Sequence, residues 1–170
     1  MTASHESTQS NRIGQLIRNL GDKNGVVREE SRHELVRMGG LAVVRALVGE
    51  LNSPRRLVRW EAAKSLVALA DPVAAHALLN ALEDGDEDVR WLAAEGLVAL
   101  QDEGLMTVLS GLTRRAKSAE FRTSAHHVLH DLKKQGHSEL IAPVLAALDQ
   151  GDPQITAPTA AFSALQALKP

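Results

Sequence analysis

The chain lacks cysteine altogether, which excludes disulfide bonds, thiolate nucleophiles and cysteine-ligated zinc or iron–sulfur centres. It also lacks tyrosine, and with two tryptophans and two phenylalanines its aromatic content is only 2%. Leucine and alanine must therefore fill most of the core. Those residues favour closely packed helices, whereas sheets favour β-branched and aromatic side chains. We therefore predict an all-α protein.

An excess of charge of either sign is missing as well. The formal net charge is −2, so no global basic field attracts nucleic acid or an anionic membrane. No stretch reaches the ~18 apolar residues of a membrane span, and the polar segment 1–11 has no apolar run that would mark a secretory signal. We expect a soluble, cytoplasmic protein in which residues 1–11 form a disordered tail.

An internal repeat is the strongest feature that the sequence does contain. The dipeptides Val27-Arg28, Val58-Arg59, Val89-Arg90 and Phe121-Arg122 recur at intervals of 31, 31 and 32 residues. Small or apolar residues occupy the fourth, eighth and eleventh positions after the start of each dipeptide. This spacing predicts one buried face of a helix, which we call helix B. The leucines at the eighth position are Leu35, Leu66, Leu97 and Leu129.

A second amphipathic segment, helix A, precedes each helix B, and turn residues such as Ser53-Pro54 and Asp84-Gly85-Asp86 separate the two. Each repeat is thus predicted to be a helical hairpin. The predicted helices A cover residues 13–20, 41–51, 73–82, 105–112 and 139–148. We predict one α-solenoid over residues 12–170, with repeats at 12–40, 41–71, 72–104, 105–136 and 137–170. The fifth copy is divergent, because Pro158 stands where the other helices B have arginine.

The segment from Leu82 to Leu97, LEDGDEDVRWLAAEGL, resembles a HEAT repeat, and within that family the short bacterial type related to phycobilin-lyase (PBS-lyase) HEAT-like proteins. The resemblance covers nearly all of the chain after residue 11. It implies an armadillo-like superhelix whose B helices line a concave face. It also implies an arginine–aspartate bridge at the turn between helices A and B, where Asp22 and Asp84 each precede their arginine by six residues.

The four repeated arginines are best interpreted as structural. They occupy one equivalent position in successive repeats, where guanidinium groups can bond turn carbonyls and carboxylates and so fix the stacking of repeats. An anion-binding stripe is the alternative reading. We leave these arginines out of the candidate site.

The helix B positions that point away from the core supply a candidate binding surface. Trp60 and Trp91 hold the same position in adjacent repeats, so their indoles could lie side by side, with Leu92 extending the patch. Alternatively, each indole packs flat on its neighbouring repeat. Charges around the pair are mixed, which favours a protein segment over a polyanion. The candidate partner-binding residues are His33, Arg37, Trp60, Glu61, Lys64, Trp91, Leu92, Glu95 and His127.

No complete metal or catalytic constellation is found in the sequence. His33-Glu34 invites comparison with deoxyhypusine hydroxylase, a HEAT protein in which several His-Glu dyads hold a diiron centre, but this chain has one such dyad. His126 and His130 lie four residues apart, a spacing at which both could bind one metal ion from the same helix face. Two ligands make no complete site, however, and we interpret both histidines as partly buried between repeats. We predict no metal, no cofactor and no enzymatic activity.

The sequence therefore favours a non-catalytic scaffold that binds a peptide or protein segment on the concave B-helix face. Two alternatives stay open: a tetrapyrrole-handling protein of the phycobilin-lyase type, and a His-Glu metal oxidoreductase of the deoxyhypusine-hydroxylase type. Nucleic-acid binding is disfavoured because glutamates on the same face repel phosphates. The C-terminal repeat has few charged residues and a broadly apolar last helix, which could be covered by self-association.

Overall fold

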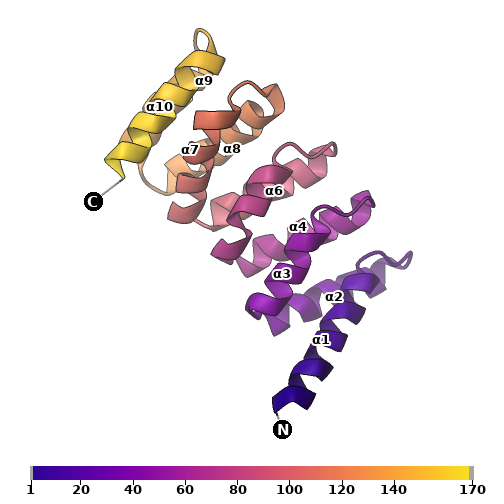
Figure 1. Cartoon of the computed structure of the whole chain (residues 1–170). Helices are drawn as coiled ribbons and strands as arrows, with labels where there is room; N and C mark the ends of the chain where they lie inside the picture. The colour runs from indigo at the N-terminus through magenta and orange to yellow at the C-terminus, as the bar shows by residue number, and fades with distance from the viewer. Residues whose placement is uncertain (1, 169–170) are drawn as a thin grey trace.

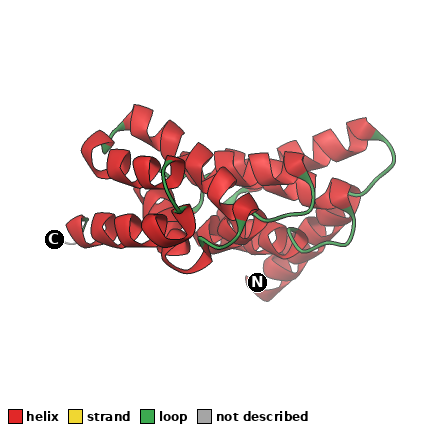
Figure 2. Ribbon diagram, turned by 90° about the horizontal axis from the view of Figure 1, so that it is seen from above, coloured by secondary structure: helices red, strands yellow, loops and turns green. Residues whose placement is uncertain are grey.

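The computed structural model of the chain describes residues 2–168, with side chains from residue 7 onward. This part of the chain contains α-helices and one short 3-10 helix but no strand (Figures 1 and 2). None of the described helices has both the length and the apolarity needed to cross a membrane. The elements are α1 (Thr2–Asn19), α2 (Gly25–Met38), α3 (Gly40–Glu50), α4 (Arg56–Leu69), η1 (Pro72–Ala74), α5 (Ala75–Ala81), α6 (Glu87–Ala99), α7 (Asp102–Arg115), α8 (Ala119–Gln135), α9 (Ser138–Asp149) and α10 (Pro153–Ala167).

The helices form two layers of a solenoid, as predicted. Helices α2, α4, α6 and α8 are the B helices, and each packs against the next. Helices α1, α3, α5 and α7 are the A helices and form the second layer, with η1 leading into α5 (Figure 1). The repeated leucine of every B helix is buried, and alanines four positions earlier, Ala62, Ala93 and Ala125, are buried with them. Small side chains at this position let neighbouring helices approach closely.

Side-chain caps start most of the B helices. Asn24, Asp86 and Ser118 each accept a hydrogen bond from a backbone N–H in the first turn of α2, α6 and α8. The helices therefore begin two residues before the repeated dipeptide. Helix α4 has no side-chain cap, since Arg55 stands at that position.

The expected disordered tail over residues 1–11 is wrong for the residues described, because α1 begins at Thr2. Ile13, Leu16 and Leu20 anchor the C-terminal half of α1 in the core. Extending an anchored helix costs little per residue, and no proline or glycine lies between Thr2 and Ile13 to stop it. The side chains from Ser7 to Arg12 are exposed, so this extension buries little.

The last hairpin departs from the repeat in a way that the sequence did not reveal. The predicted fifth helix B, α10, packs against α9 and against α7 in the layer of A helices, while α9 packs against α10 and against α8 in the layer of B helices (Figure 1). The two helices have thus exchanged layers relative to the earlier repeats. Pro158 stands where the other B helices have the arginine that closes their turns, and Thr156 Oγ1 of α10 instead donates to the carbonyl of Ala147 in α9 at 2.8 Å. The buried side of α10 consists of Ala157, Ala161 and Ala164.

Gly104 lies in the first helical turn of α7. The turn before α7 is made by Gln101, whose φ is +54°. Glycine is needed at 104 because a Cβ atom there would lie 1.9 Å from the carbonyl oxygen of Leu97. The backbones of α6 and α7 therefore touch at this point, and only a residue without a side chain fits.

We expect Gly104→Ala to lower the free energy of unfolding by about 2 kcal/mol, since backbone atoms must move to relieve the clash. Gly49→Ala is the matched control, because position 49 lies within α3 and a Cβ there meets no atom within 4 Å. That variant should be stabilised by roughly 0.5–1 kcal/mol through helix propensity. Urea denaturation followed by circular dichroism measures both. Equal effects of the two substitutions would contradict the close approach of α6 and α7.

Candidate partner-binding face

Each repeated arginine bonds the turn that precedes its own helix, as the structural interpretation requires. In every case Nη1 donates to a backbone carbonyl six residues earlier, at distances of 2.6 to 3.0 Å. The pairs are Arg28 with Asp22, Arg59 with Ser53, Arg90 with Asp84, and Arg122 with Ala116. These guanidinium groups close the A–B turns.

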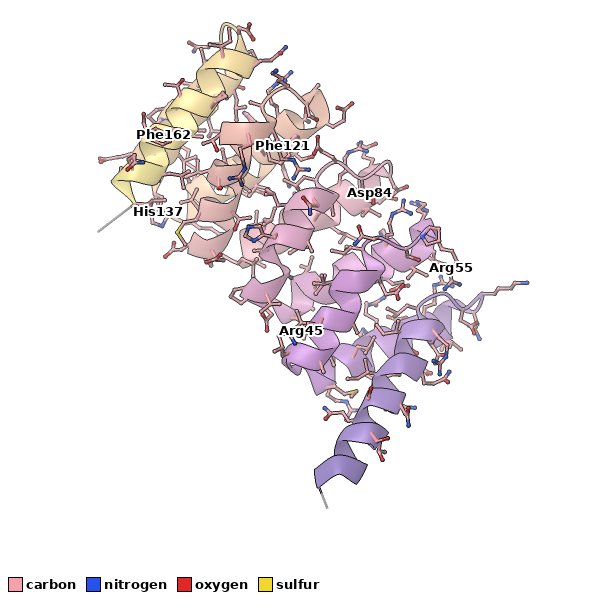
Figure 3. All side chains as sticks on the ribbon, viewed as in Figure 1. Arg45, Arg55, Asp84, Phe121, His137 and Phe162 are labelled. Atoms are coloured by element: carbon pink, nitrogen blue, oxygen red, sulfur yellow. The ribbon has the colours of Figure 1, made fainter. Side chains whose placement is uncertain are left out.

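The expected arginine–aspartate bridge joins different residues from those implied by the family resemblance. The carboxylate of Asp84 accepts from Nε and Nη2 of Arg59 in the preceding repeat, at 2.7 and 3.0 Å. This two-pronged bond raises the pKa of Arg59 above its ordinary value. Asp22 instead accepts from the backbone N–H of Asn24. The bridge thus links neighbouring repeats, and Figure 3 shows Asp84 in the loop before α6.

Glu61, predicted to bind a partner, is buried with only 3% of its surface exposed. Its carboxylate accepts from Arg32 Nη1 at 2.7 Å and from Arg28 Nε at 3.2 Å. Arg28 and Arg32 lie one turn apart on α2, so both reach the carboxylate across the α2–α4 interface. Arg32 had not been singled out in the sequence, although its spacing from Arg28 was visible. Glu61 therefore joins two repeats and is removed from the candidate site.

The two tryptophans have different environments. Trp60 is half-buried and packs against the core, and Lys64 Nζ lies 4.6 Å from the centroid of its ring. Trp91 is 55% exposed. Leu92, expected to extend an exposed patch, is 5% exposed because it faces the core side of α6. Trp60 thus follows the packing alternative, and Trp91 is the indole that is open to a partner.

A shallow groove between α6 and α8 contains Trp91, and we call it the α6–α8 groove. Its volume is about 150 Å³. The lining residues are Glu87, Arg90, Trp91, Ala94, Thr123, Ser124 and His127. Glu87 and Glu95 lie one helical turn before and after Trp91, so acidic groups flank the indole on both sides.

His127 lies at one end of this groove and contacts two carboxylates. Its Nε2 atom is 3.1 Å from Glu95 Oε1 and 3.8 Å from Asp131 Oδ2. The other oxygen of Asp131 accepts from Lys134 Nζ at 2.7 Å. That hydrogen bond is the main reason why the pKa of Asp131 is lowered from its ordinary value, so the group is ionised at neutral pH. Asp131 was not among the predicted site residues, although its spacing of four from His127 marks the same helix face.

The remaining candidates lie apart from the groove. His33 and Arg37 are exposed on α2. Helix α2 packs against α4, whereas the groove is formed by α6 and α8. Glu34 is held by a two-pronged ion pair with Arg12, with distances of 3.0 and 2.6 Å, so the His33-Glu34 dyad offers no free carboxylate.

His126 and His130 were both predicted to be partly buried between repeats, and the prediction is correct for His126 only. His126 is half-buried between α8 and α9, where its Nε2 lies 3.1 Å from Asp149 Oδ1. His130 is exposed, and its Nδ1 lies 3.3 Å from Asp131 Oδ1. The two rings are stacked, with centroids 6.3 Å apart, and each turns its nitrogen to a different carboxylate.

Comparison with known proteins gives a family and a fold. A family model described as HEAT repeats matches residues 11–98 and again residues 44–130. Among solved structures, the crystal structure of an engineered protein from a structural genomics consortium is 18% identical, with a TM-score of 0.43. That similarity covers 90% of this chain and 78% of the engineered one. A search of curated proteins found no match.

Glu61→Gln should lower the free energy of unfolding by about 3 kcal/mol, because it removes the charge that two arginines share at a buried interface. Glu29→Gln is the control, since Glu29 is exposed and its nearest oxygen is 3.7 Å from Arg32. We expect a change below about 0.5 kcal/mol there. Urea denaturation of the two variants gives the comparison. If Glu61→Gln is as stable as the wild type, the shared ion pair does not stabilise the α2–α4 interface.

Proposed function

Because the chain belongs to the HEAT-repeat family, we propose that it is a non-catalytic scaffold that binds a protein segment in the α6–α8 groove, on the face formed by its B helices. Trp91 is the observation that carries this proposal. Its indole is 55% exposed and lines the groove. Tryptophan is enriched among the residues that dominate binding energy at protein interfaces.

The acidic groups around Trp91 favour a basic partner. Glu87 and Glu95 flank the indole, whereas the guanidinium of Arg90 is held by the carbonyl of Asp84. Trp60 offers an internal parallel, since Lys64 covers its ring at 4.6 Å. An arginine or lysine of the partner would cover Trp91 in the same way and meet the glutamates at its edge. The same carboxylates repel phosphates and disfavour nucleic acid.

The two alternative functions have less support. The α6–α8 groove, at about 150 Å³, is smaller than the roughly 300–1,000 Å³ that small-molecule and cofactor sites usually occupy. A tetrapyrrole would therefore lie largely outside it. The His33-Glu34 dyad is occupied by its ion pair with Arg12, which does not favour a diiron site.

Affinity capture from cell extract with wild type and with Trp91→Ala tests the scaffold. Proteins that bind wild type should be lost with Trp91→Ala, and a purified partner segment should bind the variant at least tenfold more weakly, about 1.4 kcal/mol or more. The segment should contain arginine or lysine at its anchor. Fluorescence titration of the purified pair measures the affinity.

Met106→Ala is the matched control, because Met106 is 41% exposed and lies on α7, in the layer of A helices. It removes a large exposed apolar side chain without touching the groove. Circular dichroism confirms that both variants remain helical. If the purified segment binds Trp91→Ala as tightly as wild type, the groove is not the binding site.

We further propose that α10 pairs with a second copy of the chain. Ile155 and Phe162 are 69% and 56% exposed and lie seven residues apart, which is two helical turns on one face. Sedimentation velocity over a range of concentrations should show a dimer for wild type. Phe162→Ser should shift the equilibrium to monomer, and Val73→Ser, an exposed position in η1, should not. A monomer at every concentration would rule this pairing out.

A further inference from the structure

Three potential metal ligands lie close together at the edge of the α6–α8 groove. Of the three, only Glu95 has a part in the proposed scaffold function. Glu95 of α6 and His127 and Asp131 of α8 each offer one ligand atom, and these atoms lie within 4.8 Å of one another. All three residues are partly exposed, so an ion has access to them from solvent.

The repeat geometry explains why these side chains meet. Glu95 and His127 each stand six residues after the start of their repeated dipeptide, and α6 packs directly against α8. Asp131 lies four residues after His127, so it is on the same face of α8 one turn later. Two adjacent helices thus hold the ligands, and both helices are anchored in the core.

The imidazole of His127 can donate a hydrogen bond to only one of the two carboxylate oxygens that it faces. The same nitrogen, His127 Nε2, faces Glu95 Oε1 at 3.1 Å and Asp131 Oδ2 at 3.8 Å. One N–H can donate well to only one of these oxygens. A cation placed between the three atoms would contact both oxygens and the nitrogen lone pair at once.

The distances suit a small transition-metal ion. Tetrahedral ligands at about 2.1 Å from zinc are themselves about 3.4 Å apart. The two separations from His127 Nε2, 3.1 and 3.8 Å, lie on either side of that value. The two carboxylate oxygens lie within 4.8 Å of each other, so rotation of the Glu95 and Asp131 side chains would bring them to the same spacing. One imidazole nitrogen with two carboxylate oxygens is a ligand set that Zn²⁺ accepts, with water at the open position.

Neighbouring groups already hold the ligands in place. Lys134 Nζ and His130 Nδ1 both contact Asp131 Oδ1, at 2.7 and 3.3 Å, and so turn Oδ2 toward His127. Such outer contacts orient metal ligands in proteins and tune their affinity. Lys134 also neutralises one of the two negative charges in the absence of a metal.

We propose that Glu95, His127 and Asp131 bind one divalent transition-metal ion of the Zn²⁺ type and that the ion joins the third repeat to the fourth. The metal site and the proposed partner surface share Glu95, but the metal site does not use Trp91. Because the indole of Trp91 is not a ligand, Trp91→Ala should keep its Zn²⁺ affinity even though it loses the protein segment. Failure of either proposal is therefore visible separately.

Isothermal titration calorimetry of Zn²⁺ into the tag-free full chain should show one saturable site. His127→Ala should weaken binding at least tenfold, because it removes the nitrogen ligand. His126→Ala is the matched control: it removes the neighbouring histidine on α8, which pairs with Asp149 instead, and should bind as wild type does.

Trp91 gives an independent optical measure, since it lies one turn from Glu95 and lines the groove with His127. In a Trp60→Phe background, Co²⁺ should quench the remaining indole with a one-to-one end point, and Glu95→Gln should weaken the response at least tenfold. Circular dichroism establishes that each variant is folded. Absence of saturable Zn²⁺ binding to wild type, or equal affinity in wild type and a folded His127→Ala, would overturn the site.

Discussion

The packing of each B helix against the next is the interaction on which the rest of this structure depends. Buried alanines at Ala62, Ala93 and Ala125 allow the close approach, and the leucines four positions later fill the space between the layers. Each such leucine contributes about 1.5–3 kcal/mol on burial. When helices pack in this way, side chains at equivalent positions of neighbouring repeats lie next to one another on the outer surface. Glu95 and His127 are neighbours for this reason.

Charged side chains add a second set of links between repeats. Asp84 receives two hydrogen bonds from Arg59, and Glu61 is shared by Arg28 and Arg32. Each link is confined to one interface, and Arg28 and Arg59 also close turns through backbone carbonyls. A buried ion pair adds little net stability compared with apolar packing, but the loss of one partner is costly. These pairs therefore fix how one repeat is oriented on the next.

The ends of the stack follow different rules because each lacks a neighbour. Helix α1 continues well beyond its buried anchors, whereas α9 and α10 exchange layers at the other end. Exposed apolar side chains remain on α10, whereas the terminal repeats of solenoids usually present a polar outer face. The middle repeats, with neighbours on both sides, hold the groove and the His127 cluster on their B helices.

The sequence by itself determined the all-α class, the hairpin period and the structural part played by the four arginines, because these depend on local spacing and on contacts repeated at a fixed interval. It also led to Trp91, Glu95 and His127 as candidate surface residues. Only the tertiary structure decided that Glu61 and Leu92 are buried, that Trp60 packs against the core and that Asp84 pairs with the preceding repeat. The helical period predicts on which face of its helix a side chain lies. Whether that side chain is buried depends on which residues of the next repeat pack against it. For the same reason the sequence could not reveal the exchanged layers of α9 and α10, since α10 packs on α7, three helices earlier in the chain, while α9 packs on α8.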